Sequence, residues 1–150
     1  MIKILYLLSS LSFVFPFIGD LSDPIRTAGD IGQIASPLYG LYLTYENSDT
    51  EGRTQFFKSS VATILTTHLL KQTIDKPRPD GTNNNSFPSG HTSAAFSGAT
   101  FIHQRYGFNR AWAVYVVASF VGYSRVHAEK HYWEDILAGG ILAGINSWIF

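Results

Sequence analysis

The sequence of 150 residues contains no cysteine. Disulfide bonds, thiolate nucleophiles and thiolate zinc sites are therefore excluded. Excess charge is also absent, because 11 Lys and Arg residues balance 11 Asp and Glu residues. Nothing in this balance indicates a nucleic-acid partner. Strand-like alternation, internal repeats and low-complexity tracts are missing as well, which favours an all-α fold.

Charged residues are scarce and aromatic residues are abundant, each making up 15% of the chain. This composition departs from the soluble average toward a membrane protein or a very apolar helical protein. The mean hydropathy of +0.05 is nevertheless low for a chain that lies wholly in lipid. The length fits one domain with a sizeable core.

The N-terminal stretch has one basic residue, Lys3, followed by an apolar run that is broken only by serines and Pro16. This pattern is typical of a secretory signal peptide and equally of an uncleaved membrane anchor. We expect residues 1–19 to be one or the other and residues 20–150 to form one helical domain. If Lys3 stays in the cytoplasm, the chain that follows is delivered to the non-cytoplasmic side.

Apolar segments at helical spacing predict a compact bundle of about five to six helices. The segment at residues 56–74 carries basic side chains, so we expect an amphipathic helix that packs inside the bundle rather than a lipid-facing one. Gly140 and Gly144 have the spacing of tightly packed helix pairs. Residues 75–87 form the longest loop, and residues 19–29 and 46–53 are shorter connectors. The predicted helices are residues 31–45, 56–74, 91–106, 111–123 and 134–150.

The stretch Phe87-Pro88-Ser89-Gly90-His91-Thr92 predicts the start of a helix. Proline and glycine shape a tight turn, and Ser89 is suited to the N-cap position. The free N–H groups and positive dipole end of such a helix form an anion site. His91 would stand at its edge.

Functional side chains concentrate in three stretches, at residues 71–79, 88–91 and 124–135. A phosphate monoester needs several fixed donors, an in-line nucleophile and an acid for the leaving alkoxide. Arg78 and Arg125 offer planar two-pronged donors, and Lys71 offers a point charge. His131 can attack phosphorus if Asp135, four residues later, orients its ring.

His91 can supply the acid, so this set of residues needs no metal or other cofactor. A metal alternative also exists, since His127, His131 and Asp135 stand at four-residue steps. The nearby cations Arg125 and Lys130 oppose a divalent ion there. His68 and His103 lie outside the three stretches and are expected to be structural, whereas Tyr132 and Trp133 are expected at the rim of the site or at a membrane interface.

The sequence resembles the three-part signature of the type 2 phosphatidic acid phosphatase superfamily. Its parts are Lys with six intervening residues before Arg-Pro, then Pro-Ser-Gly-His, then Ser-Arg with five residues before His and three more before Asp. The match extends from Lys71 to Asp135 with every signature position present. The resemblance implies a helical-bundle fold. It also implies that His131 forms a phosphohistidine, that Asp135 orients it, and that His91 acts as general acid and later as base. It assigns the phosphate cradle to Lys71, Arg78, Ser89, Gly90 and Arg125.

We predict that the protein is a metal-independent phosphatase that hydrolyses phosphate monoesters. A membrane lipid phosphate is the favoured substrate, and a soluble monoester is the alternative substrate. A vanadate-dependent haloperoxidase and a non-catalytic phospholipid-binding membrane protein are the alternatives. We expect a membrane partner, a place in the cell envelope and an active site on the non-cytoplasmic, periplasmic side.

Overall fold

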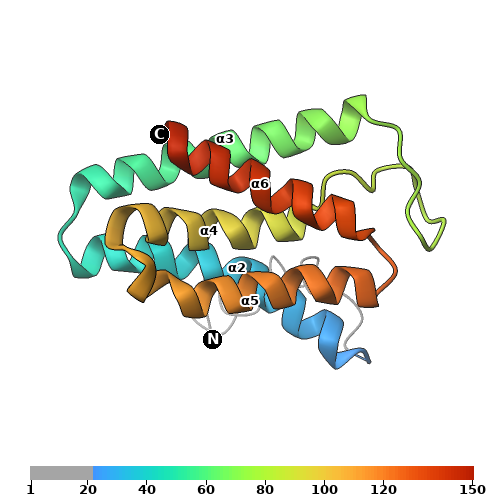
Figure 1. The fold of residues 1–150 in the computed structure, drawn as a ribbon, viewed down its shortest axis with the longest axis horizontal. Coiled ribbons are helices and arrows are strands. Elements are labelled where there is room, and N and C mark those ends of the chain that lie inside the picture. Colours follow the sequence, from blue (N-terminus) through green and yellow to red (C-terminus); the bar gives the residue numbers. More distant parts are fainter. Residues whose placement is uncertain (1–21) are drawn as a thin grey trace, which may run out of the picture.

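A computed structural model describes residues 22–150, and this part of the chain forms five α-helices and no β-strand. The central helix, α4, packs against all four others (Figure 1). The all-α prediction and the predicted number of helices are confirmed. The predicted leader or anchor at residues 1–19 lies outside the described residues. The helices are α2 (Pro24–Glu46), α3 (Thr50–Thr73), α4 (Gly90–Tyr106), α5 (Phe108–His127) and α6 (Trp133–Ile149).

Each predicted segment coincides with one helix, apart from Ile74 and Phe150 at two C-terminal ends, and α2 and α3 begin well before their predicted starts. α2 includes residues that we expected in a connector, because Asp23 caps the backbone N–H groups of Ile25 and Arg26 and Pro24 occupies the first turn. The helix also continues through Pro37. α3 begins at Thr50 because the Asp49 carboxylate accepts from the Gly52 N–H at 2.8 Å. The predicted loop at residues 75–87 contains no helix.

The orientation of α3 is the reverse of the prediction. Its apolar stripe, including Ile64 and Leu69, is more than half exposed, at 64% and 60%. The face that packs into the bundle is lined instead by hydroxyl residues such as Thr63 and Thr67. Their hydroxyls are satisfied internally, since Thr63 donates to the Ser59 carbonyl at 2.8 Å and Thr67 donates to Ser93 at 3.1 Å. Periodicity located the stripe, but not the side to which it turns.

Small residues allow the helices to approach closely. A Cβ at Gly98 of α4 would lie 2.4 Å from the backbone of Ser36, so the α2–α4 contact needs glycine there. Between α4 and α6 the tightest point is Gly139, where a Cβ would lie 2.7 Å from the Ser89 carbonyl oxygen. The predicted pair Gly140 and Gly144 makes only ordinary contacts, at 3.5 Å and 3.8 Å.

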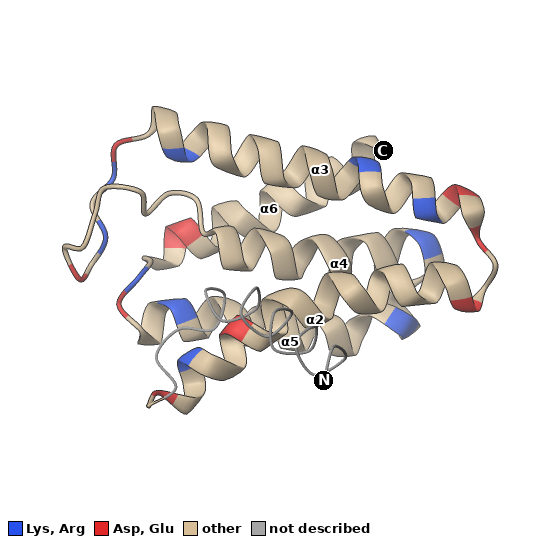
Figure 2. Ribbon diagram, turned by 180° about the vertical axis from the view of Figure 1, so that it is seen from behind, with Lys and Arg blue, Asp and Glu red and all other residues tan. Residues whose placement is uncertain are grey.

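Charged residues gather toward the two ends of the bundle, and the middle of the helices is largely free of them (Figure 2). Exposed apolar side chains cover the outside of α3, α5 and α6. In residues 22–150, no helix has both the length and the apolar character that crossing a bilayer requires.

Replacing Gly98 with alanine should destabilise the fold, since the added methyl group meets backbone that cannot move aside. Overpacking of this kind costs about 1–3 kcal/mol. The matched substitution Gly144→Ala has open contacts and should be neutral or stabilising, because alanine is the better helix former. The thermal unfolding midpoint of purified Gly98→Ala should therefore fall, and that of Gly144→Ala should stay unchanged or rise. Equal midpoints for the two variants would contradict the close α2–α4 contact.

Candidate active site

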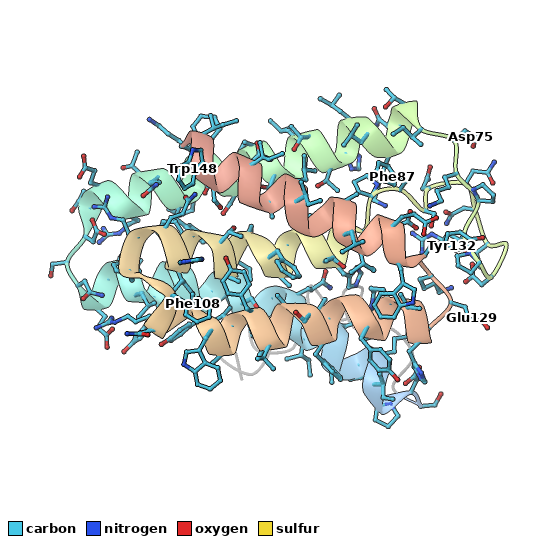
Figure 3. All side chains as sticks on the ribbon, viewed as in Figure 1. Asp75, Phe87, Phe108, Glu129, Tyr132 and Trp148 are labelled. Atoms are coloured by element: carbon cyan, nitrogen blue, oxygen red, sulfur yellow. The ribbon has the colours of Figure 1, made fainter. Side chains whose placement is uncertain are left out.

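The three motif stretches converge at one end of the bundle, where the loop before α4 and the connection between α5 and α6 meet. Figure 3 shows Asp75 and Phe87, in the loop before α4, at the same end of the bundle as Glu129 and Tyr132, in the connection between α5 and α6. We call this end the site end. The predicted residues come to it from five places: Lys71 from the last turn of α3, Arg78 from the loop, Ser89, Gly90 and His91 from the start of α4, Arg125 from the last turn of α5, and His131 and Asp135 from the start of α6.

His131 is buried, with 3% of its surface exposed, and lies just before the first residue of α6. Its Nδ1 is 3.6 Å from Asp135 Oδ2, which is beyond hydrogen-bond distance. Within residues 22–150 this buried nitrogen has no hydrogen-bond partner. The spacing of four residues predicted a pair on one helix turn. Because His131 precedes the helix, Asp135 instead accepts from the Tyr132 N–H at 2.9 Å.

Asp135 is fully buried and is held by three donors. Besides the Tyr132 N–H, it accepts from Ser86 Oγ at 2.5 Å and from Lys76 Nζ at 2.6 Å. Burial raises the pKa of this carboxyl, but the hydrogen bonds from Lys76, Ser86 and the Tyr132 N–H outweigh burial and lower the pKa below its usual value. Asp135 is therefore an ionised, fixed negative charge beside the His131 ring.

The electrostatics of the site end keep His131 neutral. Burial lowers its pKa most, and the positive charges of Lys71 and Arg78 lower it further, to about 3. Asp135 acts in the opposite direction and only partly compensates. The imidazole is thus an uncharged base with an available lone pair at weakly acidic and neutral pH.

His91 has a different environment, with 32% of its side chain exposed. Its Nε2 lies 3.0 Å from Oδ1 of the buried Asp30 on α2. The pKa of His91 lies below its usual value, because burial and the charges of Arg125 and Arg78 lower it, although the hydrogen bond to Asp30 raises it. The charge of Arg78 therefore lowers the pKa of both histidine rings.

The start of α4 has the predicted capped geometry. The Ser89 hydroxyl oxygen accepts from the Thr92 N–H at 3.4 Å and from the Thr92 hydroxyl at 2.9 Å. The Ser89 N–H donates to the Asp135 carbonyl at 3.0 Å, which ties α4 to the first turn of α6. A Cβ at Gly90 would lie 3.7 Å from Cε of Lys71, so the lysine stem passes over this turn.

The cations of the first motif are fixed by the loop. Lys71 Nζ donates to the Asn85 carbonyl at 2.9 Å, and the Arg78 backbone N–H donates to the Asn83 carbonyl at 2.9 Å. Nε of Arg78 is buried and has no partner in the described part of the chain. This buried N–H is a donor that an anion can satisfy.

Three residues of the site end were missed at the sequence level: Asp30, Lys76 and Ser86. Lys76 and Ser86 lie inside or beside the predicted motifs, but only the loop fold shows that both hold Asp135. For Asp30 the available signal was an acidic residue in an otherwise apolar helix, which needs a buried partner.

Two of the other histidines pair with residues outside the motif stretches. His127 pairs with Asp23 at 3.5 Å, and His103 contacts the Tyr115 hydroxyl at 3.1 Å. No cluster of three or more His, Cys, Asp or Glu residues that could hold a metal ion occurs in residues 22–150.

A groove of about 320 Å³ between α3 and α4 begins at the site end. Lys71 and Gly90 line its mouth, and residues down to Phe56 of α3 and Ser97 of α4 line its length. Fifteen helical residues separate Lys71 from Phe56, so the groove follows α3 for about 20 Å. His68 lies on this wall.

Comparisons with known proteins agree with this geometry. The sequence profile of the PAP2 superfamily matches residues 54–150. The chain is 46% identical over 86 residues to a lipid A 1-phosphatase of Porphyromonas gingivalis, a match that covers 53% of this chain and 19% of the relative. It is 27% identical over 148 residues to a lipid A 4'-phosphatase of Helicobacter pylori, which covers 93% of this chain and 65% of the relative. The chain thus spans less than two thirds of the length of either relative.

The fold is similar to the crystal structure of Aquifex aeolicus LpxE, with a TM-score of 0.69. The two sequences are 19% identical, and the alignment covers 93% of this chain and 92% of the other. The profile match includes all three motif stretches and both histidines of the site end. The chain therefore belongs to the PAP2 superfamily, the type 2 phosphatidic acid phosphatases and their relatives.

Proposed function

We propose that this protein is a metal-independent phosphatase that hydrolyses the phosphate monoester of a membrane lipid through a phosphohistidine intermediate. The observation that carries the proposal is the convergence of two differently tuned histidines, three cations and a helix N-terminus at one end of the bundle. Family membership supports it, because the motif residues occupy the positions of the family signature.

In the proposed reaction the phosphate binds among Lys71, Arg78, Arg125 and the first N–H groups of α4. His131 Nε2 attacks phosphorus, the bond from phosphorus to the ester oxygen breaks, and His91 gives its proton to the departing alkoxide. Asp135 stabilises the positive ring that results, and the 3.6 Å separation closes to a hydrogen bond as charge develops. Water then attacks phosphorus while His91 takes its proton, and the bond to His131 breaks.

A lipid substrate is supported by the relatives and by the groove. Two relatives are lipid A phosphatases, and a third is lipid phosphate phosphatase 1 of Arabidopsis thaliana. The α3–α4 groove starts between Lys71 and Gly90, two members of the proposed cradle. An alkyl chain attached to a phosphate held there has a path into apolar surroundings.

Membrane association completes the proposal. Exposed apolar side chains surround the helices, including Trp148 at 82% exposure and Leu137 at 65%. Contiguous apolar surface of this kind marks an interaction with lipid or protein. We propose that this surface contacts membrane lipid and that residues 1–19 act as leader or anchor. We place the site end on the non-cytoplasmic side of the cell envelope.

Replacing His131 with alanine should abolish phosphate release, by at least about 10³-fold, because the nucleophile is lost. His91→Ala should instead accumulate a phosphoenzyme from an activated ester such as p-nitrophenyl phosphate, since a good leaving group needs no acid while the second step lacks its base. The adduct should be labile in acid and stable in base, and EDTA should not change turnover. His103→Ala, at the other end of α4, is the control. Full activity of His131→Ala would refute the nucleophile.

Removing the charge of Lys71 should raise the pKa of His131 above about 3, because that charge is the second largest cause of the low value after burial. The Lys71→Met variant tests this, and Lys58→Met on the same helix is the control, since Lys58 is exposed and remote from the site end. A titration followed by ¹⁵N NMR of the imidazole measures the change. An unchanged His131 titration in Lys71→Met would show that the lysine does not face the ring.

Filling the α3–α4 groove should reduce activity on lipid substrates and leave activity on soluble substrates almost unchanged. Ala94→Trp places an indole among the residues that line the groove. It should lower kcat/KM for long-chain phosphatidic acid by about 10-fold or more, and leave turnover of p-nitrophenyl phosphate within about 2-fold. Ala113→Trp is the matched control, because it lies in a hollow between α2 and α5 that contains no motif residue. Equal effects on both esters would exclude the groove as the lipid path.

A further inference from the structure

Asp30 is a buried carboxylate outside the three motif stretches, with 2% of its surface exposed. Its Oδ1 lies 3.0 Å from His91 Nε2 and 2.6 Å from Arg125 Nη1. One oxygen atom is therefore shared by the general acid and by a cation of the cradle in the proposed function. In residues 22–150 two buried carboxylates each lie within ion-pair distance of two residues of the motif stretches: Asp30 with His91 and Arg125, and Asp135 with Lys76 and His131.

The fold brings α2 to this position by means of glycine. A Cβ at Gly29 would lie 1.8 Å from Ser124 Oγ and 2.9 Å from Arg125 Nη2, and a Cβ at Gly32 would lie 2.7 Å from Val121. The backbone of α2 thus lies directly against α5 on both sides of Asp30. This contact places the carboxylate below the start of α4, where His91 stands.

We propose that Asp30 is a positioning residue of the phosphatase site, which fixes the ring of His91 with Nδ1 as the nitrogen that exchanges the proton, and fixes the guanidinium of Arg125 for the phosphate. The proposal rests on the proposed function. Because a carboxylate accepts only, Nε2 of His91 is the donor in this pair. The neutral ring therefore carries its hydrogen on Nε2, and Nδ1 remains for the leaving oxygen.

The same carboxylate leaves part of Arg125 available to an anion. A guanidinium has five N–H donors. Asp30 takes one, the Arg26 carbonyl takes a second at 2.7 Å, and the Ser124 hydroxyl takes a third at 3.1 Å. The remaining two are held in a fixed direction although the side chain is buried. A preoriented donor loses little entropy when phosphate binds.

Asp30 also sets the charge balance at His91. The charged groups that act on this ring are Asp30 from α2, Arg125 from α5 and Arg78 from the loop. Both arginines lower the pKa of His91, and Asp30 raises it. Without the carboxylate, the ring loses its proton at lower pH and the acid needed for the first step is missing.

The test uses Asp30→Asn in the full-length protein, with phosphatidic acid and p-nitrophenyl phosphate as substrates. The alkaline limb of kcat/KM should move to lower pH by about one unit, which is typical of losing one adjacent opposite charge. Turnover of phosphatidic acid, whose alkoxide needs the acid, should fall by about 10-fold or more, while turnover of the activated ester should fall by less than about 3-fold.

Asp49→Asn is the matched control, because Asp49 forms an equally close pair with Arg105 at the opposite end of the bundle. It reports the general effect of losing such a pair, and its pH profile should equal that of the unaltered protein. An unshifted limb in Asp30→Asn, or equal losses on both esters, would overturn the proposal.

A measurement on the unaltered protein decides the matter independently of how well Asp30→Asn folds. ¹⁵N NMR should show neutral His91 with its hydrogen on Nε2, and a ring protonated on Nδ1 instead would overturn the proposal. If the unaltered protein releases no phosphate from either ester, the proposed function is refuted. The tautomer then still shows whether Asp30 holds the ring.

Discussion

The site end depends on two buried carboxylates that neutralise a cluster of cations. Arg125 is buried and Lys71 and Arg78 are half-buried, and such a group of cations is stable only if opposite charge is buried with it. Asp30 from α2 pairs with Arg125, and Asp135 from α6 pairs with Lys76. Each carboxylate also lies beside one of the two histidines. The groups that stabilise the cluster are therefore the ones that set the protonation of the rings.

The interior of the bundle explains how these groups come so close. Where α4 meets α2 and α6, glycine stands at the closest points, and hydroxyl side chains line the packed face of α3. Large apolar side chains such as Phe101 and Ile102 form a buried core, while many others on α3, α5 and α6 turn outward. Because the helices are separated by small atoms, a carboxylate as short as that of Asp30 reaches across to α4 and α5. Bulky residues at Gly29 or Gly139 would separate the charged groups from their partners.

Sequence reasoning predicted the all-α fold, the number of helices and the convergence of the motif stretches, because these depend on local periodicity and on residues with distinct chemistry. It failed where the answer depends on which elements meet. The helix at residues 56–74 was expected to pack inside the bundle because of its basic side chains, and its sequence does not show that hydroxyls bonded to the helix backbone and to Ser93, rather than the apolar stripe, face inward. Asp30 lies far from the motifs along the chain, so only the packing of α2 against α5 reveals it. The spacing of His131 and Asp135 suggested a helical pair, whereas the carboxylate caps the helix that His131 precedes.

The two histidines have opposite roles in the proposed reaction, His131 as a neutral nucleophile and His91 as an acid. Their surroundings differ, because His91 has a hydrogen-bonded carboxylate and His131 does not. Asp135 is occupied by Lys76, Ser86 and a backbone N–H, so it holds no hydrogen bond to His131, and the nearby cations keep that ring neutral. Asp30 bonds directly to His91, which is also more exposed, so this ring retains a partner for its charged form. Burial lowers the pKa of both rings, to about 3 for His131, and His91 alone has a hydrogen-bonded carboxylate that opposes this shift. Ser86 and the Tyr132 N–H occupy the Asp135 oxygen that faces His131, whereas one oxygen of Asp30 is shared by Arg125 and His91.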